Sequence, residues 1–235
     1  MALILCIETG TDICSVGVVR DGELISLRES DAGKDHAKKV AVFVNELLSE
    51  TGIAPSDIDA IAVGEGPGSY TGLRIGVSFA KGLCYGLSKP LIAISSLKAL
   101  AAVAIEDYKA GIIDIENWEN SLLCPMIDAR RMEVYLQLFN SDAEPLSDVT
   151  AEIITEQSLN EWRKNSSKNL VVFGSGAAKC ADILGATLLN VTPSVRGMAQ
   201  LAEEKFANRQ FADTAYFEPF YLKEFVVTTS KKKLF

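Results

Sequence analysis

The chain has 235 residues, 48% hydrophobic and 23% charged, with a net charge of −8 at pH 7. This composition is that of a globular protein with one large domain or two small ones, and its negative charge argues against direct binding of nucleic acid by this chain alone. No apolar run has the length of a membrane span, and the apolar start meets Glu8 too early for a signal peptide, so a cytoplasmic protein without membrane contact is expected.

The cysteines and the single histidine restrict the chemistry further. The five cysteines are scattered without a CxxC pair, mostly inside apolar runs, which predicts buried free thiols. A zinc or iron site of the usual kind needs several clustered His or Cys ligands, so no metal site is expected unless it is built from carboxylates alone. His36 begins an amphipathic segment, where a surface or interface role is favoured over catalysis.

The first half of the chain predicts three strands and then alternating helices and strands. Asp21-Gly22 separates two apolar runs and is a strong hairpin signal. Gly52 follows a run of apolar residues on one helical face and ends that helix. The expected strands cover residues 3–8, 15–20, 24–27, 58–63 and 91–94, and the expected helices lie at about 40–51, 71–86 and 95–105.

The second half repeats this order in a degraded form. Strands are expected at 122–128, 133–139, 149–154, 170–173 and 188–191, and helices at 156–163, 177–184 and 195–208. Two βββαβα units in series predict an α/β protein with a duplicated ribonuclease-H-like fold, the architecture of actin-like ATPases. The polar stretch 109–120 places the lobes at 1–108 and 109–235, with a C-terminal segment that can pack back on the first lobe. The basic residues 231–233 are expected to be a solvated tail.

The segment GEGPGSYTGLRIG, residues 64–76, follows a buried strand and opens a helix. Its glycines permit close backbone approach, and Ser69 and Thr71 are both candidate helix caps. Backbone N–H groups at such a helix start can bind an anion or phosphate. A tight turn that only lets two elements pack remains the alternative, and it is the commoner meaning of such loops.

The helix after this loop carries Gly72, Gly76 and Ala80 at intervals of four, with apolar residues around the rest of the cylinder. The sheet covers only one side of such a helix, so the second domain or a second chain is expected to cover the other, although internal packing stays open. The working hypothesis is a glycine-lined ridge that lies open on the first lobe and is shielded by another polypeptide. Tyr70 and Arg74, near the helix start, have the amphipathic character of interface centres.

Two glycine-containing loops are the candidate nucleotide site. In an actin-like fold the first hairpin turn meets the phosphates, and this chain has Glu8 and a Thr-Gly-Thr turn there. A second loop, Gly174-Ser-Gly176, stands at the equivalent place in the second half. Asp128 is a candidate base or metal ligand with Arg130 nearby, or the two form a structural ion pair. The candidate nucleotide residues are Thr9, Gly10, Thr11, Gly174 and Gly176.

The segment GEGPGSYTGLRIGVSFAKGL resembles the signature of the TsaB (YeaZ) family of bacterial tRNA threonylcarbamoyladenosine biosynthesis proteins. Four further segments support it: ILCIETGTDICSVGVV, the helix that begins at Asp35-His36, MIDARRMEVY and the late PFYLK. The resemblance implies a non-catalytic scaffold or activator subunit that pairs with the metal-containing transferase TsaD, joins the ATPase TsaE, contacts tRNA only through the complex and forms a homodimer when alone. TsaD-like proteins carry a metal-binding histidine motif that a chain with one histidine cannot contain.

The resemblance also implies which residues contact the partner, and it implies no catalytic residue. No cofactor is required by the chain itself, while ATP or ADP at the two glycine loops stays open. A small ATP-dependent phosphotransferase of the sugar-kinase type is the alternative function. Lys223 departs from the family, in which arginine is common. The expected interface residues, for TsaD or for a second copy, are His36, Val40, Phe43, Val44, Leu47, Tyr70, Gly72, Leu73, Gly76, Phe79 and Ala80.

Overall fold

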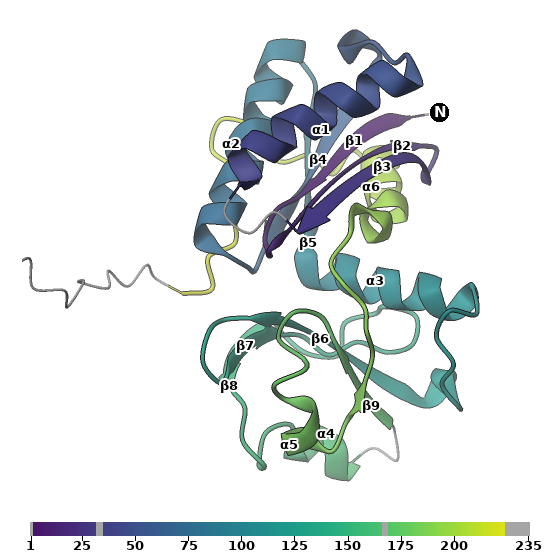
Figure 1. Ribbon diagram of the computed structural model, residues 1–235, viewed down its shortest axis with the longest axis vertical. Coiled ribbons are helices and arrows are strands. Elements are labelled where there is room, and N and C mark those ends of the chain that lie inside the picture. Colours follow the sequence, from purple (N-terminus) through teal and green to yellow (C-terminus); the bar gives the residue numbers. More distant parts are fainter. Residues whose placement is uncertain (1, 32–34, 166–168, 224–235) are drawn as a thin grey trace, which may run out of the picture.

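The structure, a computed structural model, describes residues 2–31, 35–165 and 169–223. It has two lobes, each built on a five-stranded mixed sheet, with the helix α3 (Ser96–Lys109) between them (Figure 1). No helix in the described part of the chain has both the length and the apolarity to cross a membrane. The predicted basic tail at 231–233 lies outside the described residues.

The first sheet has the strand order β3-β2-β1-β4-β5. Strands β1, β2 and β3 are antiparallel neighbours, whereas β4 pairs parallel with both β1 and β5. Asp21 and Gly22 have φ values of 52° and 78°, the left-handed conformation that a two-residue hairpin turn requires, so the predicted hairpin is confirmed. The strands are β1 (Leu3–Glu8), β2 (Ile13–Arg20), β3 (Glu23–Asp31), β4 (Ala60–Gly66) and β5 (Leu91–Ser95).

Helices cover both faces of this sheet. The helices α1 (His36–Thr51) and α2 (Tyr70–Leu87) lie on one face, and α6 (Ala199–Ala207) lies on the other (Figure 1). Gly52 ends α1 in the left-handed conformation, as predicted. Two short 3-10 turns, η1 (Pro55–Asp57) and η3 (Val195–Met198), precede β4 and α6.

The second sheet has the order β10-β9-β6-β7-β8. Read from the other edge, β8-β7-β6-β9-β10, it repeats the strand order β3-β2-β1-β4-β5 of the first sheet. The pairing is also the same, with three antiparallel strands followed by parallel additions on the other side of the central strand. The duplicated ribonuclease-H-like, actin-like fold is therefore confirmed. The elements are η2 (Trp118–Asn120), β6 (Ser121–Asp128), β7 (Glu133–Leu136), β8 (Thr150–Ile153), α4 (Asn160–Asn165), β9 (Asn169–Phe173), α5 (Ala181–Leu184) and β10 (Thr187–Leu188).

The second lobe is less regular than its sequence pattern predicts. The strand expected to reach residue 139 stops at Leu136, and Phe139 makes only isolated bridges to Leu123 and Pro145. The helix expected from residue 177 begins at Ala181, because the preceding residues form successive i+3 turns rather than α-helical ones. The helix expected from 195 likewise starts as the 3-10 turn η3.

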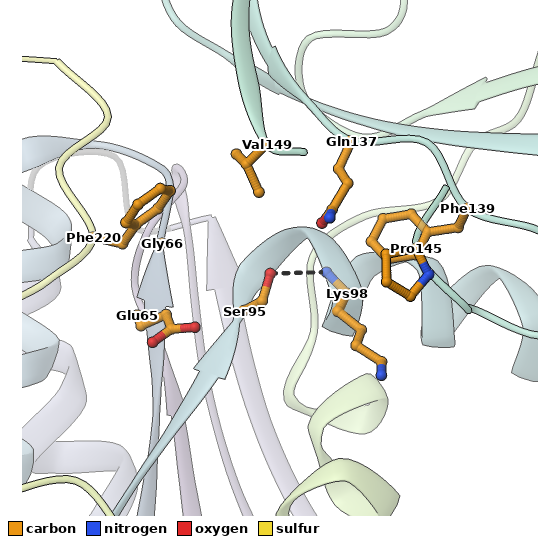
Figure 2. Close-up of a pocket in the computed structure, with 9 residues that line it drawn as sticks. All are labelled: Glu65, Gly66, Ser95, Lys98, Gln137, Phe139, Pro145, Val149 and Phe220. Atoms are coloured by element: carbon orange, nitrogen blue, oxygen red, sulfur yellow. Dashed lines mark hydrogen bonds between the residues drawn. The ribbon is translucent and has the colours of Figure 1, made fainter. Parts of the chain in front are cut away.

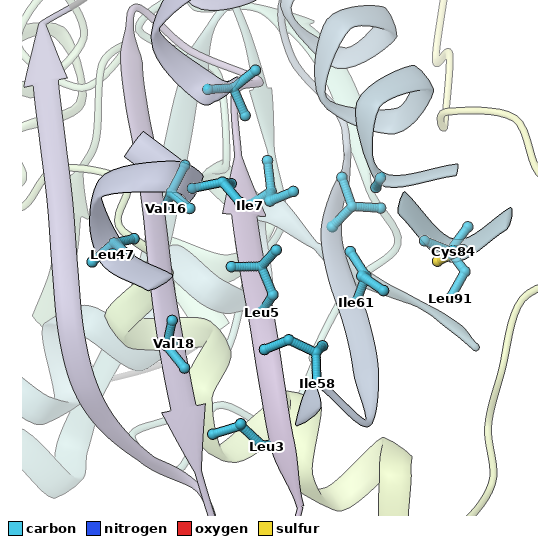
Figure 3. Packing of buried hydrophobic residues seen from close by; sticks show 14 of the residues in the cluster. Leu3, Leu5, Ile7, Val16, Val18, Leu47, Ile58, Ile61, Cys84 and Leu91 are labelled. Carbon is cyan, nitrogen blue, oxygen red and sulfur yellow. The ribbon is translucent and has the colours of Figure 1, made fainter. Parts of the chain in front are cut away.

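The largest core cluster fills the space between the first sheet and helices α1 and α2 (Figure 3). Leu5 and Ile7 of β1 point into it, while Ile4 and Cys6 point to the opposite side, under α6. Because β1 is buried on both faces, its sequence is a continuous apolar run rather than an alternating one. Burial of each such side chain stabilises the fold by about 1.5–3 kcal/mol. All five cysteines are buried free thiols, as predicted.

A C-terminal strap, residues 212–223, crosses the first lobe after α6. Lys81 of α2 holds it by donating hydrogen bonds from Nζ to the carbonyl oxygens of Ala215 (3.1 Å) and Phe217 (2.9 Å). The backbone N–H of Phe220 then donates to the carbonyl oxygen of Glu65 at 2.8 Å. The strap thus runs along α2 towards the glycine loop (Figure 1).

The end of the strap reaches the second lobe. Tyr221 packs its ring 4.9 Å from that of Tyr70, and Lys223 forms an ion pair with Glu133 of β7. Helix α3 links the lobes as well, because its residues contribute to the cores of both. The lobe boundary at 108/109 stays a prediction.

Candidate functional site

The buried carboxylate of Glu8 lies at the carboxyl end of β1, where it contacts the turn after β1 and the start of α3. Glu8 is 2% exposed, and it accepts hydrogen bonds from the N–H of Gly10 (2.6 Å) and the hydroxyl of Ser96 (2.7 Å). Ser96 is the first residue of α3, so the carboxylate lies at that helix N-terminus. Desolvation nevertheless raises the pKa of Glu8 above its ordinary value, because burial outweighs the hydrogen bonds that lower it.

The glycine loop packs directly on this end of β1. A Cβ atom on Gly64 would lie 2.2 Å from Glu8 Oε2, and one on Gly68 would lie 2.3 Å from the carbonyl oxygen of Gly10. The N–H of Ser69 donates to that same carbonyl at 2.6 Å. Ser69 is the N-cap of α2 and accepts from the N–H of Gly72 at 3.3 Å. These glycines therefore serve close packing, the commoner of the two meanings of the loop.

The glycine stripe of α2 faces inward. A Cβ on Gly72 would lie 2.1 Å from the carbonyl oxygen of Thr9, and one on Gly76 would lie 2.2 Å from its hydroxyl. Ala80 is fully buried in the same lobe. The hypothesis of an open glycine ridge shielded by a second chain is wrong, because the end of β1 covers this ridge. The helix pattern shows which residues share a face but not which face meets the sheet.

His36 is also inside the lobe rather than on its surface. The residue is 5% exposed, and Nε2 lies 2.8 Å from the carbonyl oxygen of Thr11. Little of His36 is therefore exposed on the single chain, and its expected contact role stays a prediction. Most of the other expected interface residues are buried in the first lobe as well, and only Phe43, Tyr70 and Phe79 are partly exposed. The fully buried members of that set are Val40, Val44, Leu47, Gly72, Leu73, Gly76 and Ala80.

Among the exposed residues of the two helices, which also include the charged Lys38, Glu46, Glu50 and Arg74, eight uncharged ones are here called the outer helix face. Its members are small or uncharged, and a Cβ on Gly82 or Gly86 would meet no atom within 4 Å. Tyr85 is 87% exposed and Val42 is 45% exposed. Helices α1 and α2 pack against each other, so these positions lie on one helix layer. The face consists of Ala37, Ala41, Val42 and Asn45 of α1 and Ser78, Gly82, Tyr85 and Gly86 of α2.

The structure brings together only part of the candidate nucleotide site. A cavity of about 500 Å³ lies between the first hairpin and the second glycine loop, and Thr11, Asp12, Gly174 and Ser175 contribute to its lining. Thr9 is 2% exposed and hydrogen-bonded to Gly72, and it does not line the cavity. Among the described residues, no lysine or arginine lines it, so phosphate groups would meet the Asp12 carboxylate without a cationic partner.

The remaining glycines of that candidate site have packing roles. A Cβ on Gly174 would lie 2.5 Å from the carbonyl oxygen of Met126, and one on Gly176 would lie 2.7 Å from Val134. A Cβ on Gly10 would lie 3.0 Å from the Glu8 carboxylate. Each of these glycines therefore lets one segment of the chain approach another. Only Gly174, whose φ is 97°, also lines the cavity.

Asp128 and Arg130 lie in the same turn, but the ionic partner of Asp128 is not the expected Arg130. Lys179 contacts Asp128 Oδ1 at 2.5 Å and also donates to the carbonyl oxygens of Arg131 (2.6 Å) and Glu133 (2.8 Å). The second carboxylate contact is the backbone N–H of Arg130 at 2.7 Å. Lys179 therefore replaces the Arg130 guanidinium as the partner of Asp128. These bonds tie the turn to the segment after β9.

A second cavity, here called the junction cavity, was not predicted from the sequence. It has a volume of about 330 Å³ and lies where the ends of β4 and β5, the start of α3, the segment after β7 and the C-terminal strap meet (Figure 2). Its signal in the sequence is a single acidic residue, Glu65, between two glycines at a strand end. Its lining consists of Glu65, Gly66, Ser95, Lys98, Gln137, Phe139, Pro145, Val149 and Phe220. Over residues 2–31, 35–165 and 169–223, no cluster of His, Cys, Asp or Glu is arranged to hold a metal ion.

Comparison with known proteins identifies the family. The chain is 32% identical to the tRNA threonylcarbamoyladenosine biosynthesis protein TsaB of Haemophilus influenzae, over 94% of this chain and 93% of that one. The chain belongs to the TsaB (YeaZ) family. The Escherichia coli member of the TsaB family is 29% identical, over 94% of each chain. A Pseudomonas aeruginosa crystal structure, described as similar to peptidase YeaZ, has a TM-score of 0.76 and 26% identity, covering 95% of this chain and all of that one.

The chain is also similar to a transferase family. A family model described as TsaD, tRNA N6-adenosine threonylcarbamoyltransferase, matches residues 29–158. The tRNA N6-adenosine threonylcarbamoyltransferase of Thermus thermophilus is 33% identical, but over only 43% of this chain and 36% of the transferase. The TsaB proteins of Haemophilus influenzae and Escherichia coli thus match along 93% and 94% of their length, whereas this transferase matches along about a third of its own.

Proposed function

We propose that this chain is a non-catalytic scaffold or activator subunit of the assembly that makes tRNA N6-threonylcarbamoyladenosine. The observation that carries this proposal is the whole-length match to proteins named for threonylcarbamoyladenosine biosynthesis, against a partial match to the transferases. Its partner is a TsaD-like transferase, and a TsaE-like ATPase joins the assembly in the cytoplasm. When alone, the chain pairs with a second copy, and tRNA is contacted only through the complex.

The outer helix face is the surface that we assign to this pairing. Small side chains such as Ala41, Ser78 and Gly82 let a partner helix approach the backbones of α1 and α2 closely. Tyr85 adds a large, exposed, amphipathic side chain of the kind that dominates interface energies. This assignment moves the interface from the buried residues of the two helices to their solvent-facing positions.

Two further observations are compatible with a subunit that does not perform the transfer. The single histidine of the chain already bonds the carbonyl oxygen of Thr11 inside the lobe. The net charge of −8 disfavours direct binding of the tRNA backbone, so the basic surface for tRNA is supplied by another subunit.

Co-expression with the cognate TsaD-like subunit tests the proposal. We expect the two chains to co-elute in size-exclusion chromatography and to restore tRNA modification in cells that lack this chain. Gly82→Arg and Ala41→Arg are expected to abolish co-elution while circular dichroism stays unchanged, because both positions are exposed. Ile112→Arg is the matched control, since Ile112 is 72% exposed but lies after α3, outside the outer helix face.

The outcomes separate the function from the surface. Independent elution of the two wild-type chains, without restored modification, contradicts the proposed function. Co-elution that survives both arginine variants leaves the function intact but rules out the outer helix face as the interface.

A further inference from the structure

The junction cavity contains a carboxylate whose position requires an explanation. Strands β4 and β5 pair in register up to Gly64, and the pairing resumes only at Gly66, so Glu65 is the extra residue of a β-bulge. A bulge turns a side chain away from the regular alternation of the strand. It brings Glu65 to the carboxyl end of a parallel strand, facing the cavity, which is where α/β sheets bind their ligands (Figure 2).

No described residue donates a hydrogen bond to the Glu65 carboxylate, which is half-buried and still reached by solvent. The positive charge that acts on it belongs to Lys205, but that ammonium group donates to the carbonyl oxygen of Ala93 at 2.6 Å. Partial burial raises the pKa of Glu65, the sign of a carboxylate with incomplete compensation for lost water. A partly desolvated acceptor of this kind gains free energy from any donor that reaches it.

The other walls of the cavity define what can bind beside this carboxylate. Phe139, Phe220 and Val149 provide apolar surface, including two aromatic rings. The Gln137 amide nitrogen donates to the carbonyl oxygen of Ser147 at 2.9 Å, which leaves the amide oxygen to accept a hydrogen bond. The positive charge of Lys98, which also lines the cavity, opposes a ligand with two cationic groups more strongly than a ligand with one.

We propose that the junction cavity binds a small organic monoamine in its protonated form. The ammonium group bonds the Glu65 carboxylate, and the apolar body of the ligand packs between Phe139, Phe220 and Val149. An ammonium group supplies three donors, and aromatic faces attract cations. The cavity volume of about 330 Å³ is at the lower end of the range for small-molecule sites. This site is independent of the outer helix face and of the proposed pairing.

Titration of the full chain with phenethylammonium, followed by NMR and calorimetry, tests the proposal. We expect saturable binding of phenethylammonium, with shifts of the Gln137 side-chain amide signals, and no saturation with 2-phenylethanol or 3-phenylpropionate. Glu65→Gln is expected to weaken binding about tenfold or more, the effect of losing one charge-assisted hydrogen bond. Glu204→Gln is the control, because Glu204 is exposed on α6 and does not line the cavity.

Several results would overturn the site. They are absence of saturation, equal or tighter binding of the alcohol or the carboxylate, and unchanged affinity in Glu65→Gln. If Glu65→Gln unfolds, the NMR titration of the wild-type chain still tests the site. Signal shifts at residues other than Gln137 and Phe220 would show that the amine binds elsewhere. Phe220→Ala offers a second test, with a several-fold loss of affinity expected from the missing aromatic wall.

Discussion

The hydroxyl of Thr9 donates a hydrogen bond to the carbonyl oxygen of Gly72 at 2.8 Å. This bond fastens the carboxyl end of β1 to the first turn of α2. It is possible only because Gly72 and Gly76 lack side chains, since a Cβ on either would lie within about 2.2 Å of Thr9. The pair therefore explains why the glycines of α2 belong to the interior of the lobe.

Gly76→Ala is expected to destabilise the monomer by about 2 kcal/mol or more, because the new methyl group displaces the Thr9 hydroxyl. Gly82→Ala, on the same helix, is expected to stabilise it by about 0.5–1 kcal/mol, because its Cβ would meet open space. Urea denaturation of the two variants measures both effects. Equal stabilities would show that α2 does not contact β1 in this way.

Glu8 predicts a pH dependence of stability. Its pKa in the folded chain is raised above the ordinary value of 4.5, mainly by desolvation. The protonated form is thus favoured by folding, so its contribution to stability is complete below pH 4.5 and is lost as the pH rises through the raised pKa. In Glu8→Gln this fall with pH should be absent.

Urea denaturation at a series of pH values measures the effect of Glu8. The control is Glu116→Gln, since Glu116 is exposed and remote from the Glu8 cluster. A wild-type stability that rises over the same interval, with Glu8→Gln unchanged from it, would contradict the interpretation.

Lys81 is expected to hold the C-terminal strap to α2. Lys81→Met removes two hydrogen bonds to strap carbonyls while it keeps the aliphatic stem, so a loss of about 1–2 kcal/mol of local stability is expected. Hydrogen exchange at the Phe220 amide, which bonds the Glu65 carbonyl, reports on the strap directly. Lys38→Met, at an exposed position of α1, should leave that exchange rate unchanged.

Mg-ATP is expected to show no saturable binding to the isolated chain at millimolar concentration. Other atoms of the chain occupy the space beside the glycines of both loops. No described lysine or arginine lines the 500 Å³ cavity between the loops. Isothermal calorimetry tests this expectation. Saturable binding that Ser175→Ala weakens would place a nucleotide in that cavity and revive the phosphotransferase alternative.

The strand and helix order was readable from the sequence because local chemistry sets it. The Asp21-Gly22 turn, the Gly52 cap and the Ser69 cap each act over a few residues, and each lies where it was expected. The second lobe was harder, since the segment around Gly176 forms turns that depend on its packing against β6. The junction cavity could not be predicted, because Glu65, Gln137 and Phe220 are far apart along the chain.

The amino-acid sequence by itself determined the family, the duplicated order of elements and the buried, unpaired state of the cysteines. Only the tertiary structure decided the direction of the Gly72–Gly76 stripe, the burial of His36 and the place of Glu65. The physical reason is that periodicity assigns residues to a common face of a helix, whereas the neighbour of that face is set by long-range packing. In this chain the neighbour of the glycine face is Thr9, and the faces left to solvent are the ones that carry Gly82 and Tyr85.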